Sequence, residues 1–176
     1  MRTEKTVTIA TVTYSNLASQ SWQNIYDVIN NRTNVPDPYS SAYRKFVYTR
    51  DPDVKNAGFA GYPYIIVNDP EFSESGQRTT DGKSAFIEFS AEIEIVSSER
   101  GYGNEDGKGS QYIKTIADDI LATLNDPTIR NTFMNTGGML MSRPRATSAS
   151  VEPLHDTLVW RKSIFVSFKA KRPMHA

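Results

Sequence analysis

The chain has 176 residues, with 20 lysines and arginines against 20 aspartates and glutamates, so it has no net charge at neutral pH. This length suits a single domain spanning residues 1–176, and neutrality argues against binding nucleic acid mainly through bulk charge. The absence of cysteine excludes disulfides, thiolate zinc sites and cysteine nucleophiles. No window approaches the roughly 18 apolar residues of a membrane span, and the N-terminus lacks a signal-peptide core, so we expect a protein that is made in a cytosol and either used there or built into a particle there, with no membrane contact.

Charge is uneven along the chain. From residue 139 to the end, seven basic residues stand against two acidic ones, which gives this part +5 and the remainder −5. The basic residues are Arg143, Arg145, Arg161, Lys162, Lys169, Lys171 and Arg172, and the acidic ones are Glu152 and Asp156. Such opposition favours either contacts between copies of the chain or oppositely charged neighbouring strands within one sheet.

The first elements expected are a strand and a helix. Residues 7–12 are threonine-rich and β-prone, which predicts a short strand or arm. A helix is predicted from about residue 17 to residue 30, because apolar residues recur there at spacings of three and four. These residues are Ala18, Trp22, Ile25 and Ile29.

Residues 35–83 are rich in proline, aspartate, serine and glycine, which predicts a loop-rich segment. Only residues 43–50 and 62–68 look extended. Residues 68–84 are expected to form a long loop that either works at an interface or is mobile. Aromatic residues of this part either contact another protein or anchor its own loops; they are Tyr39, Tyr43, Tyr48, Phe59, Tyr62 and Tyr64.

The strongest strand pattern spans residues 84–98, where apolar and polar residues alternate. One face carries Ala85, Ile87, Phe89, Ala91, Ile93 and Ile95, and the other carries Glu88, Ser90, Glu92 and Glu94. A helix is predicted over residues 110–126, with Ser110 as its N-cap. Its apolar stripe is Ile113, Ile116, Ala117, Ile120, Leu121 and Leu124.

The remaining elements are a short helix and two strands. The helix is expected to begin at Asp126, with Pro127 in its first turn, and to end at Gly137 and Gly138. Residues 139–153, interrupted by Pro144, are typical of an edge or bulged strand. Residues 156–171 predict a strand joined to it by a hairpin, with Leu158, Trp160, Ile164, Val166 and Phe168 on one face.

The order of these elements, β-α-β-β-β-α-α-β-β, indicates an α+β fold. We expect a mixed, mostly antiparallel sheet packed against two or three helices, with long loops and a C-terminal β-hairpin. If the two long strands are neighbours, Glu88, Glu92 and Glu94 face basic residues of the last strand. Those residues are Arg161, Lys169 and Lys171, and each cross-strand pair contributes about 0.2–1 kcal/mol.

The glycine-rich stretch ERGYGNEDGKGSQ, residues 99–111, suggests a phosphate-binding loop but fails its pattern. With Gly107 and Lys108 in place, the required first glycine is Tyr102, and Gly109 follows the lysine where serine or threonine is needed. Glu105 and Asp106 also place negative charge where an anion would bind. A flexible connection between strand and helix explains the stretch better.

Catalytic chemistry has little support in the sequence. Glu88, Glu92, Glu94 and Asp118 leave a two-metal nuclease or phosphohydrolase open, but a charge ladder or a solvated face explains the glutamates more simply. His155 falls in the predicted hairpin turn and His175 next to the C-terminus, neither a setting for a general base. No nucleophile elbow is present. We therefore expect no enzymatic activity, no metal and no cofactor.

The layout as a whole resembles that of the tail terminator, or tail-completion, proteins of long-tailed bacteriophages. The resemblance rests on QSWQNIYDVIN, YPYIIV, FIEFSAEIEIVSS, the glycine-rich loop, QYIKTIADDILATL and the terminal WRKSIFVSFKAK. It covers most of the chain and is one of element order and hydrophobic rhythm, without an invariant motif. Head-closure and head-tail connector proteins of the neck have similar sizes.

The resemblance implies a structural virion protein assembled in the host cytoplasm. Its subunits form a ring, typically a hexamer, that caps the head-proximal end of the tail tube, stops tube polymerisation and offers a surface for head attachment. The implied partners are further copies of the chain, the tail tube protein, a head-closure or neck protein, and DNA that passes through the lumen without specific binding.

Two sets of residues are candidates for these contacts. The first set, for the lumen or the contacts between subunits, is Glu88, Glu92, Glu94, Arg161, Lys169 and Lys171. The second set, for interface loops, is Phe72, Arg78, Tyr102, Glu105, Asp106 and Lys108.

Overall fold

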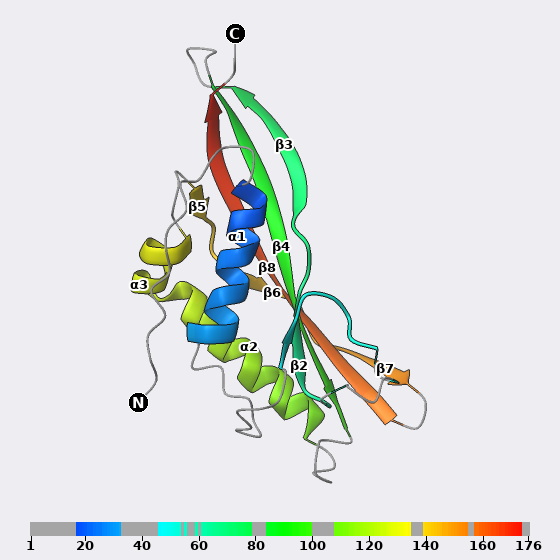
Figure 1. The fold of residues 1–176 in the computed structure, drawn as a ribbon. Helices are drawn as coiled ribbons and strands as arrows, with labels where there is room; N and C mark the ends of the chain where they lie inside the picture. Colours follow the sequence, from blue (N-terminus) through cyan, green and yellow to red (C-terminus); the bar gives the residue numbers. More distant parts are fainter. Residues whose placement is uncertain are drawn as a thin grey trace.

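Two long antiparallel strands, β4 (Ser84–Ser98) and β8 (Thr157–Pro173), run along the length of the molecule (Figure 1). They pair in continuous register from Ser84 opposite Pro173 to Ser98 opposite Val159. The structure is a computed structural model, and the residues it describes are 17–32, 46–53, 55, 59, 61–78, 84–99, 108–134, 139–154 and 157–173.

Shorter strands complete the sheet on both sides of this central pair. On the side of β4 away from β8, β4 pairs with β2 (Tyr64–Val67) and β3 (Glu71–Arg78). β1 (Val47–Tyr48) pairs with β2 in parallel. The free edge of β8 pairs in turn with β5 (Met139–Met141), β6 (Arg145–Ala146) and β7 (Ser150–Leu154). Within the described residues, the sheet has eight strands, and it is mostly antiparallel, as predicted.

The helices pack on one face of the sheet (Figure 1). They are α1 (Leu17–Asp27) with a π-helical continuation (Val28–Arg32), α2 (Gly109–Asn125), and α3 (Pro127–Ile129) with its own π-helical continuation (Arg130–Met134). Their apolar stripes meet alternate residues of β4 and β8 in the main core, as the periodicities predicted. This confirms the α+β class. None of the helices in the described ranges is long and apolar enough to cross a membrane.

A second, smaller core lies on the opposite face, beside β1 and β2. Its buried members are Tyr48, Tyr64, Ile66, Val96 and Val159, with Phe59, Tyr62 and Leu154 packed against them. The rings of Phe59, Tyr62 and Tyr64 lie 5.4–5.5 Å apart, centroid to centroid. These aromatic residues therefore anchor their own segment on the sheet, which was one of the two interpretations left open by the sequence.

The start of the short helix agrees with its sequence signals. Asp126 accepts hydrogen bonds from the backbone N–H groups of Thr128 and Ile129, at 2.8 and 3.0 Å, and Pro127 occupies the first helical position. An N-cap carboxylate in this position satisfies backbone donors that have no partner within the helix.

Several expectations are corrected. Residues 68–84 are not one long loop, because β3 (Glu71–Arg78) pairs with β4 across a register shift between Glu74 and Arg78. Ser110 is not an N-cap: α2 begins at Gly109, and Lys108 holds the N-cap position, where its side chain makes no capping hydrogen bond. Leu158 is 45% exposed instead of buried with its face of β8.

The predicted strand at 43–50 is described only as β1 (Val47–Tyr48), and β2 (Tyr64–Val67) lies within the other expected run. Other expectations fall outside the described residues. These are the strand or arm at 7–12, the hairpin turn at 155 and 156, and the two glycines at 137 and 138.

Candidate interaction surface

The sheet face turned away from α1 and α2 is divided in two. Its part beside β1 and β2 is covered by the second core, whereas the remainder is not covered by any described element. We call this remainder the open face. It carries Phe86, Glu88, Ser90 and Glu92 of β4, Phe165, Ser167 and Lys169 of β8, and Leu140 of β5.

One contact of the charge ladder predicted between β4 and β8 forms between two residues that are directly opposite each other. Glu88 and Lys169 are opposite each other in register, and their side chains approach to 3.2 Å. The Lys169 ammonium also lies 4.9 Å from the centroid of the Phe86 ring. Because both charged side chains are at least 40% exposed, the ion pair adds little stability.

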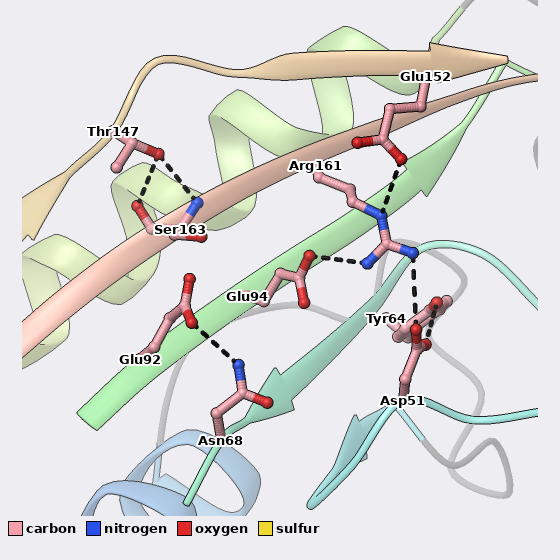
Figure 2. A network of polar contacts seen from close by, with 9 residues as sticks. All are labelled: Asp51, Tyr64, Asn68, Glu92, Glu94, Thr147, Glu152, Arg161 and Ser163. Atoms are coloured by element: carbon pink, nitrogen blue, oxygen red, sulfur yellow. Dashed lines mark hydrogen bonds and ion pairs between the residues drawn. The ribbon is translucent and has the colours of Figure 1, made fainter. Parts of the chain in front are cut away.

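Arg161 forms the second contact of the ladder, and it does so diagonally (Figure 2). Its position on β8 is opposite Val96, but its guanidinium reaches Glu94 at 2.7 Å. The same guanidinium lies 3.6 Å from Asp51 and 4.0 Å from Glu152. Arg161 therefore links β4, β7 and the segment that follows β1.

The electrostatics of Arg161 follow from this crowding. Burial is the largest single influence and acts to lower the pKa of the guanidinium, but the hydrogen bond and charge of Glu94, together with smaller contributions from Tyr64 and Asp51, raise the pKa overall. Of the three nearby carboxylates, only that of Glu94 is well shielded from solvent, since its side chain is 19% exposed. Arg161 is thus a permanently charged crosslink whose main partner is Glu94.

Tyr64 extends this network into the second core. Its hydroxyl donates a hydrogen bond to Asp51 at 3.0 Å, next to the contact between Asp51 and Arg161 (Figure 2). Burial, followed by the charge and the hydrogen bond of Asp51, raises the pKa of Tyr64. The pKa of Tyr62 is also raised, mainly by burial. Both phenols are therefore neutral at physiological pH.

Glu92 has no basic partner across the strands, because Phe165 occupies the position opposite it. The amide of Asn68, which follows β2, donates a hydrogen bond to its carboxylate at 3.3 Å instead (Figure 2). Lys171 is opposite Phe86, so its register position does not place it across from a glutamate. Among the described side chains, Glu88 and Glu94 contact basic residues of β8 as the facing stripes predicted, and Glu92 is held by an amide.

This arrangement bears on the chemistry considered from the sequence. Glu88, Glu92 and Glu94 lie on the face away from α2, whereas Asp118 is an exposed residue of α2. Throughout the part of the chain that the structure describes, no group of three or more metal-ligating side chains is placed to hold an ion. The structure does not bring together the carboxylate set on which the nuclease alternative depends.

The candidate interface loops are placed only in part. Phe72 and Arg78 belong to β3, opposite Phe89 and Ala85 of β4, so neither is a loop residue. Lys108 is exposed at the start of α2. Tyr102, Glu105 and Asp106 lie outside the described residues.

Exposed apolar side chains are the surface feature that sequence analysis missed. Among the described residues, four large ones are more than 40% exposed: Leu140 at 65%, Val151 at 46%, Leu158 at 45% and Phe165 at 42%. The alternation in residues 156–171 did place Phe165 on the polar face of its strand, and that was the available signal.

No protein-family model matches the chain, and no curated protein matches it. Among solved structures, a chain of the virion of a native gene transfer agent (GTA) particle is similar, with a TM-score of 0.52 and 14% sequence identity. The match covers 92% of this chain and 100% of that chain. The protein therefore shares its fold, over nearly its whole length, with a component of a virion particle.

Proposed function

We propose that this protein is a structural virion subunit that forms a ring on the head-proximal end of a tail tube. In this role it stops tube polymerisation and provides the surface to which the head attaches. The proposal is that of a tail terminator, and the ring is expected to be a hexamer.

The observation that carries the proposal is the end-to-end fold similarity to a chain of a virion particle. Coverage of 100% of that chain means that the similarity is not limited to a common substructure. Because many functions share one fold, the similarity supports a virion role and leaves the position in the particle to experiment. The element order and hydrophobic rhythm of the sequence favour the terminator position.

A second observation fits a protein that works by contact. The open face of the sheet is uncovered over several strand positions, and it displays Leu140 and Phe165. These are two separate positions at which the sheet face can contact another protein, since Leu140 is opposite Lys169, four residues along β8 from Phe165.

The lumen role proposed for the three glutamates has less support than a role within the subunit. Glu88 is paired with Lys169, Glu94 with Arg161, and Glu92 with Asn68. A lumen that repels DNA works best with negative charge that no cation neutralises, and of these three glutamates only Glu92 has no cation partner among the described residues, being held instead by the neutral amide of Asn68. Charge reversal of all three residues should hinder DNA transit if they line the lumen, and should leave transit intact if they do not.

The alternative within the same class is a head-closure or head-tail connector protein. Both alternatives predict binding to neighbouring particle components, but only a terminator ends tube growth. The test is polymerisation of the tail tube protein encoded in the same genome, followed by light scattering, with this protein added at a small fraction of the tube protein. Early arrest at short tube length supports the terminator role. Unchanged growth with binding at tube ends would support a neck role, and unchanged growth without binding would refute both.

A further inference from the structure

The outer edge of β3 has no partner strand in the part of the chain that the structure describes. On the side of β4 away from β8, β2 pairs with residues 93–96 of β4, and β3 pairs with residues 85–90. β1 covers the outer edge of β2, whereas β3 is the outermost described strand at its end of the sheet (Figure 1). Among the described strands, the next position in the sheet is therefore filled beside β2 and open beside β3.

β3 is also the longest described strand that has such an edge. It has eight residues, whereas β1 has two, and the three strands on the far side of β8 have three, two and five. Pro144 interrupts that far side and Pro153 lies within it, and proline has no N–H group to donate to a further strand. In β3, the stretch Glu71–Glu74 is in regular register with β4. Its outward backbone groups can pair with one more strand.

Residues 7–12, VTIATV, have the composition of a strand, and we call them the arm. Five of the six are β-branched, and none is charged, glycine or proline. They lie outside the described residues, and residues 13–16 connect them to the start of α1 at Leu17. Residues 7–16 can extend over about 35 Å, which is comparable to the diameter of a small domain. The arm is therefore long enough to reach a neighbouring copy.

We infer that the arm of one copy pairs, as an added strand, with the outer edge of β3 in a neighbouring copy. Recognition of this kind rests on main-chain hydrogen bonds, so it needs no complementary charge. The arm and the edge are different surfaces, which makes the contact heterologous, and contacts of this type close into rings. Pairing of β3 with β3 of a second copy would instead be twofold and would stop at a dimer.

This inference rests on the proposed ring and specifies one contact within it. It fails separately from the function, because a ring held together by other surfaces can still end tube growth.

Cysteine cross-linking tests the pairing, and the absence of natural cysteine makes each engineered thiol unique. One set of variants carries a single cysteine at each arm position in turn, and a separately tagged variant carries Ser73→Cys on β3. The two kinds of variant are mixed and oxidised. We expect disulfide-linked dimers of arm variant and β3 variant, strongest at alternate arm positions, because neighbouring residues of a strand point to opposite faces. Thr115→Cys, at an exposed position of α2, replaces Ser73→Cys in the control and should give only the level of random collision.

A chain that carries both cysteines distinguishes the neighbour's arm from the chain's own arm. Pairing between copies gives covalent species larger than a dimer. Pairing within one chain gives an internal disulfide with no increase in mass, and that product would overturn the inference.

The double variant Thr8→Pro with Thr11→Pro tests the contact without cross-linking. The N–H groups of positions 8 and 11 point in opposite directions along a strand, so one of them faces the edge of β3 in either register, and proline removes it. Light scattering should show self-association at least about tenfold weaker than in the wild type. Thr3→Pro, outside the arm, is the matched control and should leave self-association unchanged. Circular dichroism checks that each variant keeps its fold.

Three further results would overturn the inference. They are a double-proline variant that assembles as the wild type does, a wild type that stays monomeric at every concentration, and cross-linking no greater than in the control. If tube growth is still arrested when one of these results is obtained, the proposed function stands and only this contact is rejected.

Discussion

Arg161 of β8 and Glu94 of β4 are joined at 2.7 Å, although neither is opposite the other in the strand register. The diagonal contact turns the guanidinium toward Asp51 and Glu152 as well. A single side chain thus connects the central strand pair to β7 and to the segment that follows β1. Its removal is expected to have consequences beyond the loss of one surface ion pair.

Replacing Arg161 by alanine should destabilise the protein by about 2 kcal/mol, because Glu94 would remain largely shielded without its cation. Arg161→Lys should recover only part of this loss, since the lysine ammonium lacks the planar guanidinium group that contacts several carboxylates at once. Lys169→Ala is the matched control: its pair with Glu88 is well exposed, and its loss should cost at most about 1 kcal/mol. Urea unfolding measures all three, and equal losses for Arg161→Ala and Lys169→Ala would contradict the account.

Gly109 should not tolerate a side chain. A Cβ atom there would lie 2.8 Å from the backbone oxygen of Ser98 and 2.9 Å from Cδ1 of Trp160. Gly109→Ala should therefore cost about 1–3 kcal/mol, despite the better helix propensity of alanine. Thermal unfolding, with Thr115→Ala at an exposed position of the same helix as control, provides the measurement. A Gly109→Ala variant as stable as the wild type would show that α2 sits farther from β4 and β8.

Removing the N-cap carboxylate with Asp126→Ala should cost about 1 kcal/mol, because two backbone N–H groups would lose their acceptor. Asp118→Ala, at an exposed position within α2, is the control and should change stability much less. Chemical denaturation checks both variants. A loss in the control as large as that in Asp126→Ala would argue against a capping role.

Stability should fall as the pH rises above 10. The pKa of Tyr64 is raised by burial and by Asp51 from its ordinary value of 10.0, so above that pH the unfolded chain releases a proton that the folded protein retains. The unfolded state is then favoured. Tyr62 acts in the same direction.

The variant Tyr64→Phe isolates the contribution of Tyr64 to this decline. It should lose the hydrogen bond to Asp51 at neutral pH and show a shallower decline of stability above pH 10. Urea unfolding at a series of pH values from neutral to alkaline measures the slope. An unchanged slope in Tyr64→Phe would mean that the phenol ionises as readily in the folded protein as in the unfolded chain.

Much of the fold follows from the sequence, because the long elements have strong periodic patterns. β4 and α2 were predicted within one residue of their observed bounds, since burial on one face imposes a period of two on a strand and of 3.6 on a helix. β3 (Glu71–Arg78) was missed because EFSESGQR has no such alternation. Its extended conformation comes from pairing with β4, and no local sequence pattern indicates that pairing.

The candidate surface was less predictable than the fold. The acidic stripe of β4 and the basic stripe of β8 were expected to face each other because alternation places each on one face, and the strand register then pairs Glu88 with Lys169. The contacts of Arg161 with Asp51 and Glu152 depend on chain segments distant in sequence, and no spacing rule indicates them. Leu158 has the periodicity of a core residue, but it is exposed because the strand continues past the helices that cover its neighbours.

In the role proposed for it, this protein caps one end of a tail tube. The most direct measurement is negative-stain imaging of tubes assembled from the tube protein of the same genome, with this protein carrying a gold label. The account predicts a ring of labelled subunits at a single end of each tube and shorter tubes as its concentration increases. Label along the tube walls, at both ends alike, or nowhere on tubes of unchanged length would contradict it.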